Sequence, residues 1–222
     1  MPLSTARRTG LVDQVIEQIR QSVSCGEWPV GHRIPNEAVL VESLGVGRNT
    51  VREAVRALAH AGILEVRQGD GTYVRATSEV SGALRRLCGA ELREVLEVRR
   101  GLDVEGARLA ATNRTDADLT ELRKLLERRE EAERVGRRDD FARVDAEFHL
   151  AVIRSSHNAI LLELYRGLME VITASVATTH EMPLQVLDHG VLFEYIAVGD
   201  VEQAARTAGE LLDGILAALP AS

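Results

Sequence analysis

The stretch GVGRNTVREAVRALAHAGILEVRQGDGTYV, which runs from Gly45 to Val74, constrains the fold of this chain more than any other. Apolar residues recur at helical spacing from Arg48 to Ala61. Gly62 follows, and glycine is the residue type that most often ends a helix. Ile63–Arg67 and Thr72–Arg75 are typical of two short strands joined by the tight loop QGDG. The stretch therefore predicts a helix tied to a small β-hairpin.

Two further helices are predicted before this stretch. Apolar residues recur every four positions from Leu11 to Val23, and Asn36 is a good N-cap for a short helix over Glu37–Leu44. The intervening segment GEWPVGHRIP is rich in glycine and proline, which separate helices. Three helices followed by a hairpin within about 65 residues predict a winged helix-turn-helix.

The third predicted helix separates apolar residues from arginines. Its apolar stripe consists of Val51, Val55 and Leu58. Arg48 and Arg52 are four residues apart, so they project together on another side of the helix. A helix of this size fits the major groove of DNA, where Arg pairs with guanine and Asn with adenine. Arginines spaced in this way are by themselves more typical of a solvated helix face. The three helices, the short turns and the adjacent hairpin are what favour DNA binding.

This region resembles the winged helix-turn-helix of the GntR family of bacterial repressors. The resemblance rests on GEWPVGHRIPNEAVL, LGVGRNTVREAVRALAHAGILEV and RQGDGTYV, in the family's order and spacing. It implies that the residues that meet DNA are Arg48, Asn49, Thr50, Arg52 and Gly69. Three positions depart from the family, because Ala38 and Asp70 stand where Arg is common and Gly47 stands where Ser or Thr is usual. Each departure removes a possible phosphate contact, so we expect weaker non-specific DNA binding.

Charge divides the chain into two parts. The net charge is −7, but residues 1–75 hold nine Arg and eight acidic residues, whereas residues 76–222 hold eighteen basic and twenty-six acidic residues. Such asymmetry suggests two domains with different partners. We expect a DNA-binding domain over residues 8–75, a linker over the small, polar segment 76–82, and a second domain over residues 83–219.

The second part shows helical periodicity throughout, which predicts an all-α bundle and a mainly α protein overall. The expected helices span residues 80–88, 91–112, 115–135, 138–155, 159–178, 184–198 and 200–218. The stretches LEVRRGLDVEGARLAA, DAEFHLAVIRSSHNAILLEL and DHGVLFEYIAVGDVEQAA resemble the FCD-type effector domain of the FadR-like GntR subgroup. The resemblance implies a regulator that senses a small molecule.

One arginine falls among the apolar positions of the 91–112 helix. Arg99 shares that face with Leu92, Val95 and Leu102, and a buried arginine requires an anionic partner. The partner is either Asp103, one helical turn later, or the carboxylate of a bound effector. In the family, an arginine here often meets the effector, which suggests a small organic acid or sugar acid.

Three residues suggest a metal site in the same domain. Asp145 and His149 lie four apart on the inward face of their helix, and His189 belongs to another helix. They match the family's metal pattern, although Leu211 stands at the fourth ligand position and cannot coordinate. Two imidazoles and one carboxylate suit zinc, nickel, manganese or iron. The alternative is that these side chains only form hydrogen bonds with each other.

The sequence therefore favours a transcription regulator, typically a repressor, rather than an enzyme. We expect it to bind an inverted-repeat operator in double-stranded DNA as a homodimer. The alternative is a metal-dependent hydrolase using Asp145, His149 and His189, for which we find no general base. With two cysteines, no Cys-x-x-Cys motif and no signal peptide or membrane span, we expect a cytoplasmic location without a membrane partner.

Overall fold

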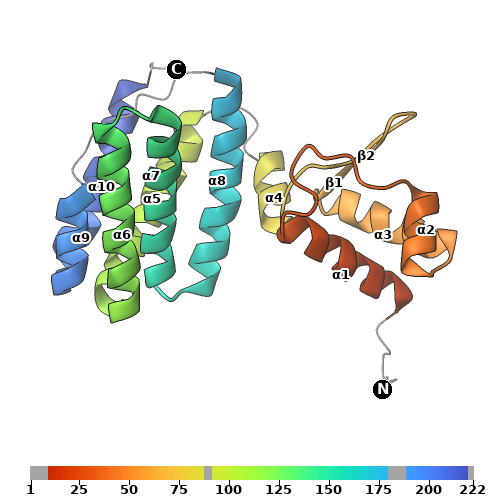
Figure 1. Ribbon diagram of the computed structural model, residues 1–222, viewed down its shortest axis with the longest axis horizontal. Coiled ribbons are helices and arrows are strands. Elements are labelled where there is room, and N and C mark those ends of the chain that lie inside the picture. The colour runs from red at the N-terminus through yellow and green to blue at the C-terminus, as the bar shows by residue number, and fades with distance from the viewer. Residues whose placement is uncertain (1–9, 88–91, 180–188, 220–222) are drawn as a thin grey trace. The chain divides into compact units, whose positions relative to one another are not determined.

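The structure is a computed structural model that describes residues 10–87, 92–179 and 189–219, with side chains described except at 174–179. The chain divides into two compact units, Met1–Leu87 and Cys88–Ser222, of which the first carries the hairpin and the second is helical throughout its described residues (Figure 1). The predicted mainly α fold is therefore confirmed.

The first unit has the predicted order of three helices and a hairpin, followed by a fourth helix. Its elements are α1 (Leu11–Ser24), α2 (Glu37–Leu44), α3 (Arg48–His60), β1 (Leu64–Arg67), β2 (Gly71–Val74) and α4 (Glu79–Leu87). Asn36 caps α2 as expected, because its side chain accepts a hydrogen bond from the backbone N–H of Val39 at 3.1 Å. β1 begins one residue later than predicted, and β2 begins and ends one residue earlier than predicted.

The hairpin is antiparallel, with Leu64 opposite Val74 and Arg67 opposite Gly71. Gly69 lies in its loop with φ of +78°, a conformation that residues with a β-carbon rarely adopt. Leu64 and Val74 contribute to the core of this unit. The same core receives the apolar faces of α1, α2 and α3, so the hairpin is fixed against the third helix.

Residues 79–82 of the segment predicted as a linker, 76–82, form the first turn of α4. This helix corresponds to the one predicted over residues 80–88, of which residue 88 lies outside the described residues. Two serines stabilise the start of this helix, because the Ser78 hydroxyl accepts from the backbone N–H of Ser81 at 3.1 Å and the Ser81 hydroxyl accepts from that of Ser78 at 3.0 Å. A β-carbon at Gly82 would lie 2.8 Å from the carbonyl oxygen of Ala61. α4 therefore packs closely against the turn that ends α3.

The second unit is a helical bundle. Its elements are α5 (Leu92–Asn113), α6 (Asp116–Arg134), α7 (Arg138–Ser155), α8 (Ala159–Thr179), α9 (His189–Val198) and α10 (Val201–Ala218). They agree with the predicted helices within one residue where the structure describes them. Residue 91 of the predicted 91–112 helix and residues 184–188 of the predicted 184–198 helix lie outside the described residues. α5 contacts α7, α8, α9 and α10, so its inward side chains reach the centre of the bundle.

Candidate functional site

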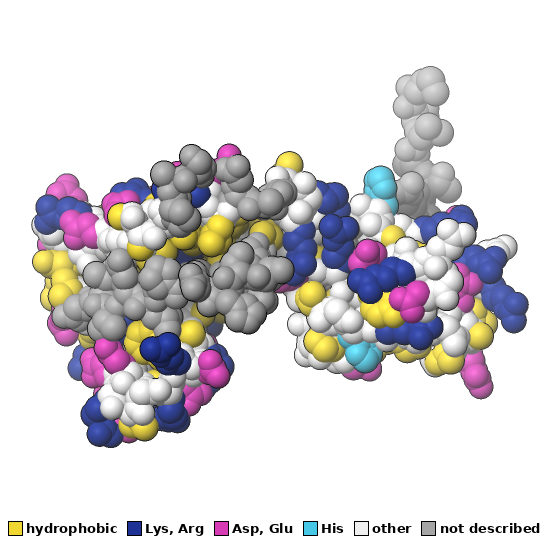
Figure 2. Space-filling model, turned by 90° about the horizontal axis from the view of Figure 1, so that it is seen from above, with side chains coloured by type: hydrophobic (Ala, Val, Ile, Leu, Met, Phe, Trp, Pro, Cys, Tyr) yellow, Lys and Arg dark blue, Asp and Glu magenta, His cyan; other side chains and the backbone are white. Residues whose placement is uncertain are grey.

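The DNA-contacting face predicted on α3 is exposed. Val51, Val55 and Leu58 are buried, as expected, and Arg48, Asn49 and Arg52 lie on the exposed side while Thr50 is half-buried. Gly69 and Asp70 at the hairpin tip are also exposed. On one face of the molecule, this unit displays arginine side chains beside acidic ones (Figure 2).

Arg52 is held by a residue of the preceding helix. Its Nε donates to Oε2 of Glu37 on α2 at 2.8 Å, and both side chains are about half exposed. This ion pair fixes one edge of the guanidinium group and limits the directions in which the arginine can project. The sequence analysis did not identify Glu37. It is the first residue of α2, and its side chain reaches Arg52 on α3.

Charged and polar side chains also gather inside the helical bundle. The buried members are Arg99 and Asp103 on α5, Arg129 on α6, His149 on α7, Tyr165 on α8 and His189 on α9, and the half-buried Asp145 joins them from α7. We call this set the buried polar cluster. Since burial of an unpaired charge is strongly unfavourable, each member must find a partner.

Arg99 and Asp103 form an intrahelical ion pair. Asp103 was one of the two anionic partners that the sequence predicts for the buried Arg99. Nε of Arg99 donates to Oδ2 of Asp103 at 3.2 Å, and the Tyr165 hydroxyl donates to Oδ1 of Asp103 at 3.2 Å. Burial alone would raise the pKa of Asp103, but Arg99 and His149 outweigh it and hold that pKa below its ordinary value. Asp103 is therefore the anionic partner of Arg99.

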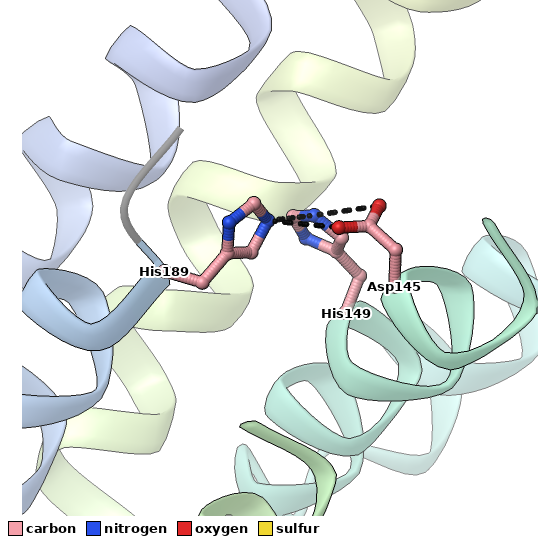
Figure 3. Close-up of side chains that lie close together, drawn as sticks. All are labelled: Asp145, His149 and His189. Atoms are coloured by element: carbon pink, nitrogen blue, oxygen red, sulfur yellow. Dashed lines mark hydrogen bonds and ion pairs between the residues drawn. The ribbon is translucent and has the colours of Figure 1, made fainter. Parts of the chain in front are cut away.

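Asp145, His149 and His189 point toward one another (Figure 3), as predicted. The two Nε2 atoms are 3.1 Å apart, and Nε2 of His189 lies 3.3 Å from Oδ1 of Asp145. Two nitrogens each about 2.1 Å from one metal ion are about 3.0 to 3.4 Å apart. The observed separations therefore suit a shared divalent ion as well as a hydrogen bond between the imidazoles.

His149 is oriented from its other side. Its Nδ1 lies 3.2 Å from Oδ1 of Asp103, so a proton on Nδ1 is shared with this carboxylate and Nε2 faces His189. Metal-binding histidines commonly have a carboxylate in this position, which fixes the tautomer and the ring orientation. The donor set thus fits a metal with three protein ligands. Leu211, where the family resemblance implies a fourth ligand, has no donor atom and is buried among apolar side chains of the core.

Arg129 is the member that sequence reasoning missed. Its Nε donates to Oδ1 of Asp145 at 2.7 Å, and its guanidinium carbon lies 4.4 Å from the centre of the Phe141 ring. Burial would raise the pKa of Asp145, but His149, His189 and Arg129 hold it below its ordinary value. Arg129 continues the buried stripe Leu122, Leu125 and Leu126 on α6, the same signal that identified Arg99.

A winged helix-turn-helix followed by a helical bundle with a buried polar cluster defines a DNA-binding regulator with an effector domain. Comparison with known families agrees. Residues 11–74 match the model for "Bacterial regulatory proteins, gntR family" and residues 94–214 match the FCD domain. The chain therefore belongs to the GntR family, in the group that carries an FCD domain, and is a DNA-binding transcription regulator.

Curated relatives are similar over most of this chain. It is 31% identical to the HTH-type transcriptional regulator LutR of Bacillus subtilis, covering 81% of this chain and 87% of the relative. It is also 31% identical to a probable D-xylose utilization operon transcriptional repressor of Paenarthrobacter nicotinovorans, covering 97% and 90%. The Glc operon transcriptional activator of Escherichia coli is 31% identical, covering 80% and 75%. These comparisons give the hydrolase alternative no support.

A solved structure, Streptococcus agalactiae GntR, is 29% identical with a TM-score of 0.56, covering 93% of this chain and all of the other. E. coli McbR/YncC shares the fold at 24% identity with a TM-score of 0.54, covering 95% and 97%. Within the described residues, the helices are too short or too polar to cross a membrane.

Proposed function

We propose that this regulator binds an inverted-repeat operator as a homodimer and that a small organic acid or sugar acid, bound in the bundle, changes its affinity for that operator. The buried polar cluster carries the proposal, because cations and imidazoles that converge inside an effector domain suit an anionic ligand. Each α3 helix reads only a few base pairs, so a two-fold dimer is needed to recognise a unique site.

The proposed DNA contacts are those of the exposed face of α3 and the hairpin tip: Arg48, Asn49, Thr50, Arg52 and Gly69. We propose repression as the outcome, which is the role named for the relative that covers 97% of this chain. The test is a mobility-shift titration with DNA from the promoter of the protein's own gene. Specific, salt-sensitive retardation is expected, and equal affinity for unrelated DNA would refute it.

The proposed metal ligands are Asp145, His149 and His189, with zinc, nickel, manganese or iron as the ion. When bound, the ion would supply a Lewis-acidic centre for effector oxygens. Elemental analysis of tag-free protein purified without chelator tests this proposal, followed by chelation and metal add-back. His189→Ala should abolish retention of the ion, whereas His157→Ala, at an exposed histidine, should not. A metal content below a small fraction of the protein, unchanged by add-back, would contradict the proposal.

Arg99 is the proposed anchor for the effector carboxylate, although Asp103 already occupies one edge of its guanidinium group. A thermal-shift screen of organic acids against wild type and Arg99→Lys tests this role, with Arg100→Lys on the exposed side of α5 as the matched control. Lysine keeps a charge for Asp103 but loses the planar fork that matches a carboxylate. If an organic acid stabilises Arg99→Lys as much as it stabilises wild type, Arg99 is only the ion-pair partner of Asp103.

A further inference from the structure

The guanidinium group of Arg129 has an unused donor in the middle of the bundle. Nη2 of Arg129 is buried and has no hydrogen-bond partner among the described residues, and the side chain as a whole is only 4% exposed. A buried donor of a charged group that lacks a partner is strongly unfavourable, more so than a neutral one. Such an atom is therefore expected to bind something that the protein itself does not provide.

The way Asp145 binds Arg129 explains why this donor is open. Exposed arginines in the same domain donate from both Nε and Nη2 to one carboxylate, as Arg108 does to Glu105 at 2.7 Å each and Arg134 does to Glu131 at 2.9 and 2.7 Å. Arg129 donates only its Nε to Asp145. The second carboxylate oxygen of Asp145 lies instead 3.8 Å from Nε2 of His149. The histidines thus share the carboxylate that would otherwise satisfy Nη2.

Two further contacts fix the position of this donor. The Arg129 guanidinium lies over the ring of Phe141, and its Nε is bound to Asp145, so Nη2 has little freedom to turn toward another partner. A planar guanidinium held in this way is preorganised for an oxygen of a carboxylate. Preorganisation lowers the conformational entropy that a ligand must overcome when it binds.

The charges of the cluster bear on whether a metal is needed beside this donor. Arg99 and Arg129 balance Asp103 and Asp145, so the four charged side chains already sum to zero. Where the family resemblance implies a fourth metal ligand, this chain has the apolar Leu211. We propose that Arg129 is an anion-binding residue of the effector site and that its Nη2 binds a small carboxylate without requiring a metal. This inference rests on the proposed effector function and names a residue through which it operates.

The test is isothermal titration calorimetry of the full chain in excess EDTA, with acetate, malonate and citrate as the probes. Wild type is expected to bind at least one of them. Arg129→Met should weaken that binding about ten- to a hundredfold, the range expected for a charged hydrogen bond. Arg128→Met is the matched control on the same helix, where Arg128 is half exposed and pairs with Glu147 at 3.1 Å, and its affinity should equal that of wild type.

Arg129→Lys covers the case in which Arg129→Met does not fold. Lysine leaves a cation for Asp145 but cannot donate to Asp145 and to a ligand from one rigid plane, so carboxylate binding should still fall about tenfold. The inference is overturned if none of the three carboxylates binds wild type in EDTA. It is also overturned if a folded Arg129 variant binds the carboxylate as tightly as Arg128→Met.

Operator binding separates this inference from the proposed function. If carboxylate binding depends on Arg129 but leaves operator affinity unchanged, Arg129 is an anion-binding residue and the effector proposal is wrong. If operator affinity responds to carboxylate only after metal is restored, and equally in Arg129→Met, the effector proposal stands and the role of Arg129 is overturned.

Discussion

Oδ1 of Asp103 lies 3.2 Å from Nδ1 of His149, while Oδ2 of the same carboxylate accepts a hydrogen bond from Arg99. One carboxylate therefore connects the proposed effector anchor with a proposed metal ligand. The carboxylate forms an ion pair with the buried Arg99 and at the same time sets the orientation of the His149 imidazole. Any change that moves Asp103 is expected to affect both residues.

We expect Asp103→Asn to lower the free energy of unfolding by about 3 to 5 kcal/mol, because it leaves the Arg99 charge buried without an ionised partner. Asp213→Asn is the matched control, since Asp213 pairs with Arg100 on the exposed side of α5. Its effect should be at most about 1 kcal/mol. Urea unfolding followed by circular dichroism measures both, and equal effects would argue against a structural role for the buried pair.

Glu37 is expected to sharpen the choice of base pair by Arg52, because the ion pair restricts the directions in which the guanidinium group can project. Arg52→Ala and Arg48→Ala should each weaken operator binding by about 1 to 3 kcal/mol. Glu37→Gln should chiefly reduce the preference for the operator over single-base-pair variants of it. Glu42→Gln, an exposed change on the same helix, is the control. If Glu37→Gln and Glu42→Gln prefer the operator over its single-base-pair variants to the same degree, Glu37 has no role in base-pair recognition.

The lowered pKa of Asp118 predicts that the stability of the protein depends on pH. Its carboxylate accepts from the backbone N–H and the hydroxyl of Thr115 at 2.8 and 2.6 Å, and it lies 2.9 Å from Nε2 of His157. Burial alone would raise the pKa of Asp118, but these partners hold it below its ordinary value. A lowered folded-state pKa contributes stability above the unfolded-state pKa of about 3.9, and this contribution is lost as pH falls through the folded-state value.

The expected result is that Asp118→Asn is less stable than wild type by about 1 kcal/mol at pH 7 and that the gap narrows below about pH 4. Thermal unfolding at a series of pH values measures it. Asp116→Asn removes a charge from the same helical turn and should have a smaller effect at pH 7, since it leaves the Asp118 hydrogen bonds intact. A gap that stays constant down to pH 2 would rule out this linkage.

Gly82→Ala should destabilise the first unit by about 1 to 3 kcal/mol, because the new β-carbon would lie 2.8 Å from the Ala61 carbonyl oxygen. Gly101→Ala provides a matched helical control, since its β-carbon would have no neighbour within 4 Å among the described residues. That change should be neutral or stabilise by up to about 1 kcal/mol. Calorimetric unfolding compares the two variants, and a harmless Gly82→Ala would show that α4 can move away from the turn.

Much of this architecture is readable from the sequence, because helical spacing and glycine positions report local structure directly. The start of α4 is ambiguous, because residues 80–82 are assigned both to the polar linker and to the helix predicted over 80–88. The structure resolves this ambiguity, since Ser78 and Ser81 cap each other at the start of the helix. For such a segment, the packing of Gly82 against the Ala61–Gly62 turn decides the structure, and a tertiary contact of this kind leaves no periodic signal.

The sequence predicts which residues belong to the candidate site better than it predicts which of them contact each other. An arginine on an apolar stripe indicates burial, and this holds for Arg99 and equally for the missed Arg129. The pattern does not specify the partner. Asp103 follows Arg99 by one helical turn and could be proposed, whereas Arg129 and Asp145 are sixteen residues apart and meet only through the packing of α6 on α7.

The close fit of α4 against the turn after α3 also defines where this protein can be divided. The match to the GntR family model ends at residue 74, but the buried Ala76 and Ser81 lie beyond that point and α4 belongs to the first compact unit. A chimera that joins this unit to a foreign effector domain should therefore retain the native chain through Leu87. Recombination between regulators that cut at residue 75 would separate the DNA-reading module from a helix that supports it, so viable exchanges are expected to carry α4 along.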